Sequence, residues 1–143
     1  MESKGIKLIL TPVDESLRSY RVVARAVEMA EAFGAKIILL HVRQKVPDIL
    51  GDPYYQKVFD HYYEKAEKAT APLKKLLEEG GVDHELLILE GDPADAIIGA
   101  SEDEKCDLIV MGTRGLTDLK GMALGSVSHK VLHGADCMVL LVP

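Results

Sequence analysis

Cysteine and aromatic residues are scarce in this chain of 143 residues, which has two cysteines, no tryptophan and 5% aromatic residues. Two cysteines cannot supply the disulfide framework of a small secreted scaffold, and Cys106 and Cys137 form no Cys-x-x-Cys redox motif. At about 150 residues per domain, we expect a single domain covering residues 1–143. A domain of this size buries enough surface to fold without disulfides or metals.

The chain also lacks an excess of basic residues and any long hydrophobic run. It has 17 Lys and Arg against 23 Asp and Glu, a formal net charge of −6, which argues against a protein that coats nucleic-acid phosphates or an anionic membrane. Apolar runs such as residues 37–40 fall far short of the ~18 residues that a membrane-spanning helix needs. Because no signal-peptide or lipidation pattern is present either, we expect a cytoplasmic protein with no nucleic-acid or membrane partner.

Several well-known catalytic and phosphate-binding signatures are missing. Neither GxxxxGK[ST] nor GxGxxG occurs in the chain. His129 and His133 have the four-residue spacing that metal sites on helices use, but Lys130 stands where a metalloprotease motif has glutamate. We interpret these histidines as surface or helix-end residues and assign no metal ligand. No Ser-His-Asp or Cys-His spacing suggests a nucleophilic enzyme, so we assign no catalytic residue either.

What the chain does have is an alternation of short apolar runs with longer helical stretches. Most of the short runs are apolar at consecutive positions, which is typical of strands that a parallel sheet buries on both faces beneath helices. The five predicted strands are residues 7–13, 36–42, 85–89, 107–111 and 137–142.

Four predicted helices separate these strands, and each has a recognisable start, stop or interruption. The resulting βαβαβαβαβ order predicts an open parallel α/β sheet with right-handed crossovers. The helix signals are a candidate cap at Ser16 with a glycine stop at Gly34, a second helix over residues 54–80 interrupted at Pro72, an N-cap at Asp92 followed by Pro93, and a fourth helix over residues 121–134.

Ligands of such sheets bind beyond the carboxyl ends of the strands, where the strand order reverses. The strongest candidate there is Gly112-Thr113-Arg114-Gly115, followed after nine residues by Gly125-Ser126. Glycine lets a ligand approach the backbone or supplies positive φ, and successive amides near a helix N-terminus bind anions. Ser126 can add a hydroxyl, and Arg114 or Lys120 a cation. The alternative is an ordinary strand-to-helix loop whose glycines serve turn geometry and packing.

Two acidic residues and an aromatic cluster each have a structural and a functional interpretation. Asp14, after the first strand, is either a ligand-binding carboxylate or a turn and capping residue. Asp92 is better explained as a helix cap than as a ligand. Tyr55, Phe59 and Tyr62 have helical spacing, so we interpret them as a stripe that faces the core, with some rings at its margin, against the alternative of a partner-binding surface.

The glycine pattern, taken with other segments, resembles the ATP-binding subclass of the universal stress protein family over essentially the whole chain. Met138, where a proline is usual, and Gly121, where a larger residue is common, depart from that pattern without removing a presumed phosphate ligand. The other matching segments are residues 11–16 (Thr-Pro-Val-Asp-Glu-Ser), 39–42 (Leu-Leu-His-Val), 91–93 (Gly-Asp-Pro) and 107–112 (Asp-Leu-Ile-Val-Met-Gly).

This resemblance implies a five-stranded parallel sheet in the order 3-2-1-4-5 with helices on both faces, and an adenine-nucleotide site where the order reverses. It implies that Asp14 contacts adenosine, that the backbone at Val42 meets the adenine, and that the glycine loop holds ribose and phosphates. Mg²⁺ or Mn²⁺ would be held through those phosphates. The implied site residues are Pro12, Val13, Asp14, Val42, Met111, Gly112, Arg114, Gly115, Gly125, Ser126 and Val127.

The same resemblance implies an ATP-, ADP- or AMP-binding stress-response switch that a protein partner reads, and a homodimer paired through residues 137–142. Pairing would also protect an apolar edge strand. Two other functions are open: slow metal-dependent ATP hydrolysis or phosphoryl transfer, for which no obvious base accompanies the glycine loop, and a dimeric scaffold without nucleotide. A flavodoxin-like carrier is disfavoured because aromatic residues are few near the strand ends.

Overall fold

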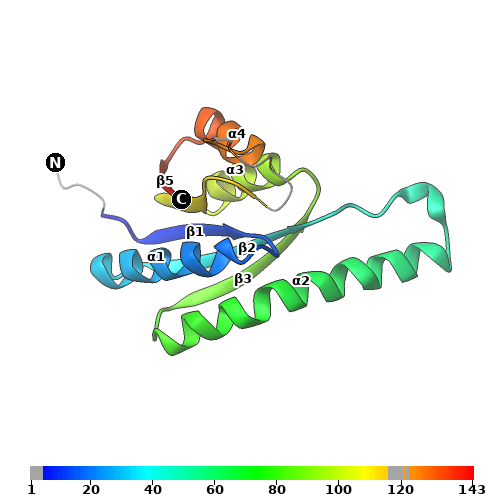
Figure 1. The fold of residues 1–143 in the computed structure, drawn as a ribbon, viewed down its shortest axis with the longest axis horizontal. Coiled ribbons are helices and arrows are strands. Elements are labelled where there is room, and N and C mark those ends of the chain that lie inside the picture. Colours follow the sequence, from blue (N-terminus) through cyan, green and yellow to red (C-terminus); the bar gives the residue numbers. More distant parts are fainter. Residues whose placement is uncertain (1–4, 116–120, 122) are drawn as a thin grey trace.

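A five-stranded parallel sheet in the order β3-β2-β1-β4-β5 forms the centre of the molecule, as predicted. The computed structural model describes residues 5–115, 121 and 123–143 (Figure 1). Its elements, in chain order, are β1 (Leu8–Val13), α1 (Arg18–Phe33), β2 (Lys36–Arg43), the short 3₁₀ turn η1 (Asp48–Leu50), α2 (Tyr54–Glu79), β3 (His84–Glu90), α3 (Pro93–Asp103), β4 (Leu108–Gly112), α4 (Ser126–Gly134) and β5 (Met138–Val142).

Helices α1 and α2 cover one face of the sheet, and α3 and α4 cover the other (Figure 1). Alternate residues of each central strand enter the two cores, because successive side chains of a strand point to opposite faces. In β1, Ile9 packs with Val23 and Leu77 beneath α1 and α2, whereas Leu10 packs with Ile97 and Val131 beneath α3 and α4. Within the described residues, no helix has the length and apolar character needed to cross a bilayer.

Burial on both faces is confirmed for the three central strands but is wrong for the two edges. Residues 37–41 of β2 and 108–111 of β4 are all buried. In contrast, β3 and β5 hold intermediate or exposed side chains at most positions, and Leu86 and Leu140 are each 37% exposed. An edge strand has a neighbour on one side only, so the covering helices do not reach all of its apolar residues.

Local signals at the helix ends are partly confirmed. Gly34 ends α1 in the left-handed conformation at φ 67°, and the Asp92 carboxylate accepts the Asp95 N–H at 3.0 Å to cap α3. The cap at Ser16 is wrong: Leu17 is the N-cap residue of α1 and no side chain caps it. Instead the Asp14 carboxylate accepts the Ser16 N–H at 2.8 Å and organises the turn that leads into the helix.

Two predicted helix boundaries need correction. The predicted interruption at Pro72 is wrong, since α2 runs through this residue without a break. Pro72 is exposed, so water can bond the carbonyl that the missing proline N–H leaves free. Leu73 and Leu77, both buried, hold this part of the helix in the core. The fourth helix begins at Ser126 and not at Gly121. Gly121 has φ 94°, a left-handed conformation that an α-helix cannot include.

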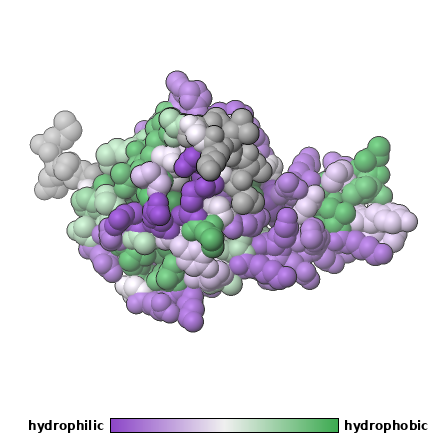
Figure 2. Space-filling view, viewed as in Figure 1, coloured by the Kyte–Doolittle hydropathy of each residue, from purple (hydrophilic) through white to green (hydrophobic). Residues whose placement is uncertain are grey.

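The first half of α2 extends well beyond the sheet, together with the connection from β2 (Figure 1). The predicted core-facing aromatic stripe lies on this arm, and that prediction is wrong: Tyr55, Phe59 and Tyr62 are half-buried, outside both core clusters. Phe59 stacks on Tyr63 and lies 4.8 Å from the Arg43 guanidinium. Apolar residues gather at the outer end of the arm, where Ile49 is 92% exposed (Figure 2).

Removal of the α3 cap should lower stability measurably. We expect Asp92→Ala to reduce the free energy of unfolding by about 1 kcal/mol, because the Asp95 N–H loses its acceptor at the helix start. Urea denaturation followed by circular dichroism measures this change. Asp103→Ala, at the exposed end of the same helix, is the control and should leave stability unchanged or slightly higher. Equal losses in the two variants would contradict the assigned cap.

Candidate functional site

The candidate site opens where β1 and β4 separate. β1 pairs with β2 along its whole length, from Leu8 to Val13, but with β4 only at Ile9 and Leu10. β4 meanwhile stays paired with β5 as far as Gly112. Pro12 lies just past the last β1–β4 pair and has no N–H to continue the ladder. The strand order reverses here, which is where ligands bind in open α/β sheets.

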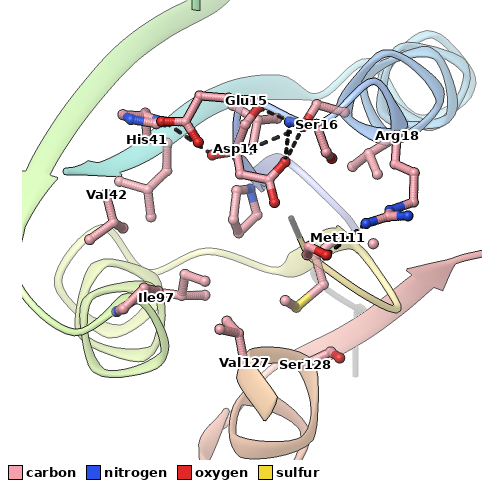
Figure 3. A pocket seen from close by; sticks show the side chains of 18 of the residues that line it. Asp14, Glu15, Ser16, Arg18, His41, Val42, Ile97, Met111, Val127 and Ser128 are labelled. Atoms are coloured by element: carbon pink, nitrogen blue, oxygen red, sulfur yellow. Dashed lines mark hydrogen bonds between the residues drawn. The ribbon is translucent and has the colours of Figure 1, made fainter. Parts of the chain in front are cut away.

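A cavity of about 490 Å³ occupies this gap, a volume within the ~300–1,000 Å³ range of small-molecule sites. Its walls come from the ends of β1, β2 and β4, the first turns of α1, α3 and α4, and one side of α2 (Figure 3). The structure brings together ten of the eleven residues that the sequence predicted, and Gly125 lies next to them as the N-cap of α4. The ten on the cavity wall are Pro12, Val13, Asp14, Val42, Met111, Gly112, Arg114, Gly115, Ser126 and Val127.

Asp14 stands at the mouth of the cavity within a network of short hydrogen bonds. Its carboxylate accepts the Ser16 N–H at 2.8 Å and the Ser19 hydroxyl at 3.2 Å. The Ser19 hydroxyl also lies 2.9 Å from the Asp14 carbonyl and accepts the Asp14 N–H at 3.1 Å. Asp14 is therefore a turn residue by its hydrogen bonds. It also lies on the cavity wall, where its carboxylate can contact a ligand.

The end of the cavity near β2 and α3 is mainly apolar. Leu40, Val42 and Ile97 line it, and Met111 reaches it from β4 (Figure 3). His41 is buried beside them, and its Nδ1 donates to the Val13 carbonyl at 3.2 Å, which ties the ends of β1 and β2 together. Apolar walls of this kind favour an apolar part of a ligand.

The opposite end is lined by Gly112, Arg114 and Gly115 after β4 and by the first residues of α4. Thr113, which is not part of the lining, bonds these segments together. The Thr113 N–H donates to the Val142 carbonyl at 3.1 Å, while its own carbonyl accepts the Gly125 N–H at 2.6 Å and the Ser128 hydroxyl at 2.7 Å. These bonds hold the N-terminus of α4 against the end of β4. Gly125 has φ −75°, which any residue adopts, so positive φ is not the reason for glycine there.

Sequence reasoning missed several polar residues of the site, among them Arg18, Ser19 and Ser128. Arg18 lines the cavity and donates from Nη2 to the Gly115 carbonyl at 2.6 Å. Ser19 and Ser128 also line it, and both are almost fully buried. Nothing in the sequence marks Arg18, because it becomes part of the site only when the start of α1 meets a loop 97 residues later. Lys120, the other cation proposed for the loop, lies outside the described residues.

The histidine pair and the cysteines lie outside the cavity wall. The rings of His129 and His133 pack edge to face at 4.6 Å on exposed positions of α4. In residues 5–115, 121 and 123–143, no cluster of three or more His, Cys, Asp or Glu side chains is arranged to hold a metal. Burial raises the pKa of the Cys106 thiol to about 12 and also raises that of Cys137, so both are poor nucleophiles at neutral pH.

The fold defines a Rossmann-like α/β protein, and its cavity lies at the strand-order reversal, where such folds bind ligands. The model of the universal stress protein family matches residues 5–143, and the chain belongs to that family. The "universal stress protein in QAH/OAS sulfhydrylase 3'region" of Thermus aquaticus is 44% identical over 137 residues, covering 95% of this chain and 98% of that protein. Universal stress protein MJ0531 of Methanocaldococcus jannaschii is 35% identical over 138 residues, covering 95% of this chain and 81% of that protein.

Solved structures show the same likeness. The structure of MJ0577, described as a hypothetical protein, superposes with a TM-score of 0.86 at 29% identity, covering 97% of this chain and 96% of that chain. A universal stress protein in complex with cAMP superposes with a TM-score of 0.78 at 26% identity, covering 98% of this chain and 99% of that chain.

The bond between Ser128 and Thr113 gives a test of how the β4–α4 connection is held. We expect Ser128→Ala to lower the free energy of unfolding by about 1 kcal/mol, because a buried hydroxyl loses its hydrogen bonds to two carbonyls. Thermal denaturation and urea titration measure the loss. Ser126→Ala, two residues earlier with an exposed side chain, should keep the stability of the unmodified protein. A fully stable Ser128→Ala variant would count against this account of the connection.

Proposed function

We propose that the cavity between β1 and β4 binds an adenine nucleotide, and that ATP is a ligand. The observation that carries the proposal is one cavity that has apolar side chains at one end and the residues after β4 and at the start of α4 at the other. The purine would lie at the end lined by Leu40, Val42 and Ile97. The ribose would pass Asp14, and the phosphates would reach the Gly112–Gly115 segment and the start of α4.

Gly112 supports this orientation. Its φ is not positive, and a Cβ built on it would lie 3.4 Å from the Arg114 carbonyl oxygen and 3.5 Å from Val22, which are ordinary contacts. Neither backbone conformation nor packing among the described residues therefore requires glycine at this position. Close approach of a ligand to the backbone is the remaining reason for it.

The start of α4 supports the phosphate end. Ser126 is the first residue of a nine-residue helix, and no side chain caps that helix. Its first residues line the cavity, so the positive end of the helix dipole lies there, which favours a bound anion. Mg²⁺ or Mn²⁺, if present, would be held through the phosphates, because the described residues supply no metal-binding cluster of their own. The ion would neutralise phosphate charge.

The family relationship supports the choice of ligand. The relative with a TM-score of 0.78 was solved in complex with cAMP, which contains the same adenosine unit. Asp14 is engaged by Ser16 and Ser19 in a turn, so we propose a binding and signalling role and not catalytic turnover. Bound nucleotide would change the surface formed by residues 112–115 and the start of α4, and a protein partner would read the change as part of a stress response.

We also propose that the protein is a homodimer paired through β5. β5 is an edge strand with no charged residue, and it exposes 57% of Met138 and 37% of Leu140. The opposite edge strand, β3, carries Glu85 and Glu90, and charges on an edge oppose further pairing. A second copy of β5 would cover the apolar edge.

Calorimetric titration with ATP tests the nucleotide site. We expect saturable binding of one ATP per chain. Gly112→Ala should weaken it about tenfold, because a methyl group keeps the phosphates from the amides, and Ser126→Ala about fivefold, because a hydroxyl donor is lost. Gly99→Ala, in open space on α3 and outside the cavity, is the matched control and should bind like the unmodified protein. If the unmodified protein binds neither ATP, ADP nor AMP, the proposed function is wrong.

Sedimentation velocity tests the dimer. The unmodified protein should sediment as a dimer, and Leu140→Lys should sediment as a monomer, because it places a charge in the apolar edge. Leu86→Lys is the control: it has the same exposure on the opposite edge strand and should remain dimeric. A monomeric unmodified protein, or dissociation by both substitutions alike, would contradict pairing through β5.

A further inference from the structure

Arg18 projects from the first turn of α1 across the cavity, toward the end opposite Val42 (Figure 3). Its Nη2 donates to the Gly115 carbonyl at 2.6 Å, which places the guanidinium beside the loop that would hold phosphates. That single bond uses one of the five N–H groups of an arginine. The other N–H groups of the guanidinium make no hydrogen bond to the described residues, so they can bond other acceptors.

The Nε atom of Arg18 is buried, and among the described residues it has no hydrogen-bond partner. A buried donor without an acceptor costs free energy, so its retention calls for a partner beyond those that the described residues supply. No carboxylate of the described residues forms an ion pair with Arg18. Arg43, at the other end of the cavity, also has a buried nitrogen without a hydrogen bond, Nη1, but that atom lies 3.1 Å from a Glu90 carboxylate oxygen in an ion pair.

A buried guanidinium N–H without a partner indicates an anionic ligand, and the other residues of the cavity indicate which kind of anion. The apolar end can hold a purine, and the amides at the start of α4, whose first residues line the cavity, can hold the phosphate nearest the ribose. Arg18 stands on the opposite wall from α4, on the α1 side of the same end (Figure 3). A phosphate chain that leaves the amides would meet the guanidinium with its second or third phosphate.

We propose that Arg18 recognises the distal phosphates of the bound nucleotide, and so makes the site favour nucleoside di- and triphosphates over the monophosphate. This inference rests on the proposed nucleotide site. Arginine suits the task because its planar fork binds phosphate oxygens through two parallel hydrogen bonds. Since Nη2 also contacts Gly115, the same side chain joins the distal phosphates, the loop and the start of α1.

The competing explanation is that Arg18 only holds the loop in place through Gly115. A loop-holding residue would affect every adenine nucleotide by the same factor, because AMP, ADP and ATP share the part that the loop binds. A residue that contacts the distal phosphates would affect ATP and ADP but spare AMP. The ratio of ATP to AMP affinity therefore separates the two roles.

The experiment is a calorimetric titration of the unmodified protein, Arg18→Gln, Arg18→Lys and Arg21→Gln with AMP, ADP and ATP. Arg21→Gln is the matched control, since Arg21 lies on the same helix and donates to a backbone carbonyl, that of Pro143 at 3.0 Å, but does not line the cavity. Thermal denaturation of each variant reports whether the fold is kept.

We expect Arg18→Gln to weaken ATP binding about tenfold or more while AMP binding stays within about twofold, and Arg18→Lys to recover part of the ATP affinity. Arg21→Gln should leave all three affinities unchanged. Equal weakening for AMP and ATP, no weakening for ATP, or an unmodified protein that binds AMP but not ATP would overturn the role of Arg18. Absence of binding of all three nucleotides by the unmodified protein would instead overturn the proposed function itself.

Discussion

The parting of β1 from β4 after Leu10 is the constraint on which the rest of the site depends. Up to that point the two strands pair within a continuous sheet, and Ile9 and Leu10 are fully buried on its two faces. Beyond it, β1 follows β2 while β4 follows β5. The gap needs a residue that gives up no ladder hydrogen bond, and Pro12 meets that need because it has no N–H. After β1 the chain enters α1 on one face of the sheet, and after β4 it enters α4 on the other face, so the gap between the two strands stays open.

Short hydrogen bonds keep the walls of the gap in place. Ser19 and Asp14 bond to each other through backbone and side-chain atoms at the start of α1, and His41 holds the end of β2 to Val13. On the other wall, Thr113 joins β5, Gly125 and Ser128. Hydrogen bonds within the chain therefore hold the walls, whereas the buried Nε of Arg18 has no partner among the described residues, and nothing in their packing requires a glycine at position 112. A preorganised frame with unused binding groups is what a ligand site requires.

Much of this could be predicted from the sequence, because short-range signals decide it. The alternation of apolar runs predicted the sheet, and Asp92 and Gly34 marked helix ends whose hydrogen bonds are local. Predictions were wrong where tertiary packing decides the outcome. The core contacts of Leu73 and Leu77 keep α2 helical past Pro72, and the aromatic stripe lies on an arm beyond the sheet. Arg18 and Ser128 escaped notice for a related reason, since their partners are 97 and 15 residues away in the chain.

The central claim is that one cavity holds the base at the end of β2 and the phosphates between β4 and α4. Amide chemical-shift mapping during a titration with ATP tests it most directly, since each backbone N–H reports on its own surroundings. We predict the largest changes at Val42, Gly112 to Gly115 and Ser126 to Ser128, with little change along β3. Changes confined to β3 or to the outer end of α2, or none at saturating ATP, would contradict the account.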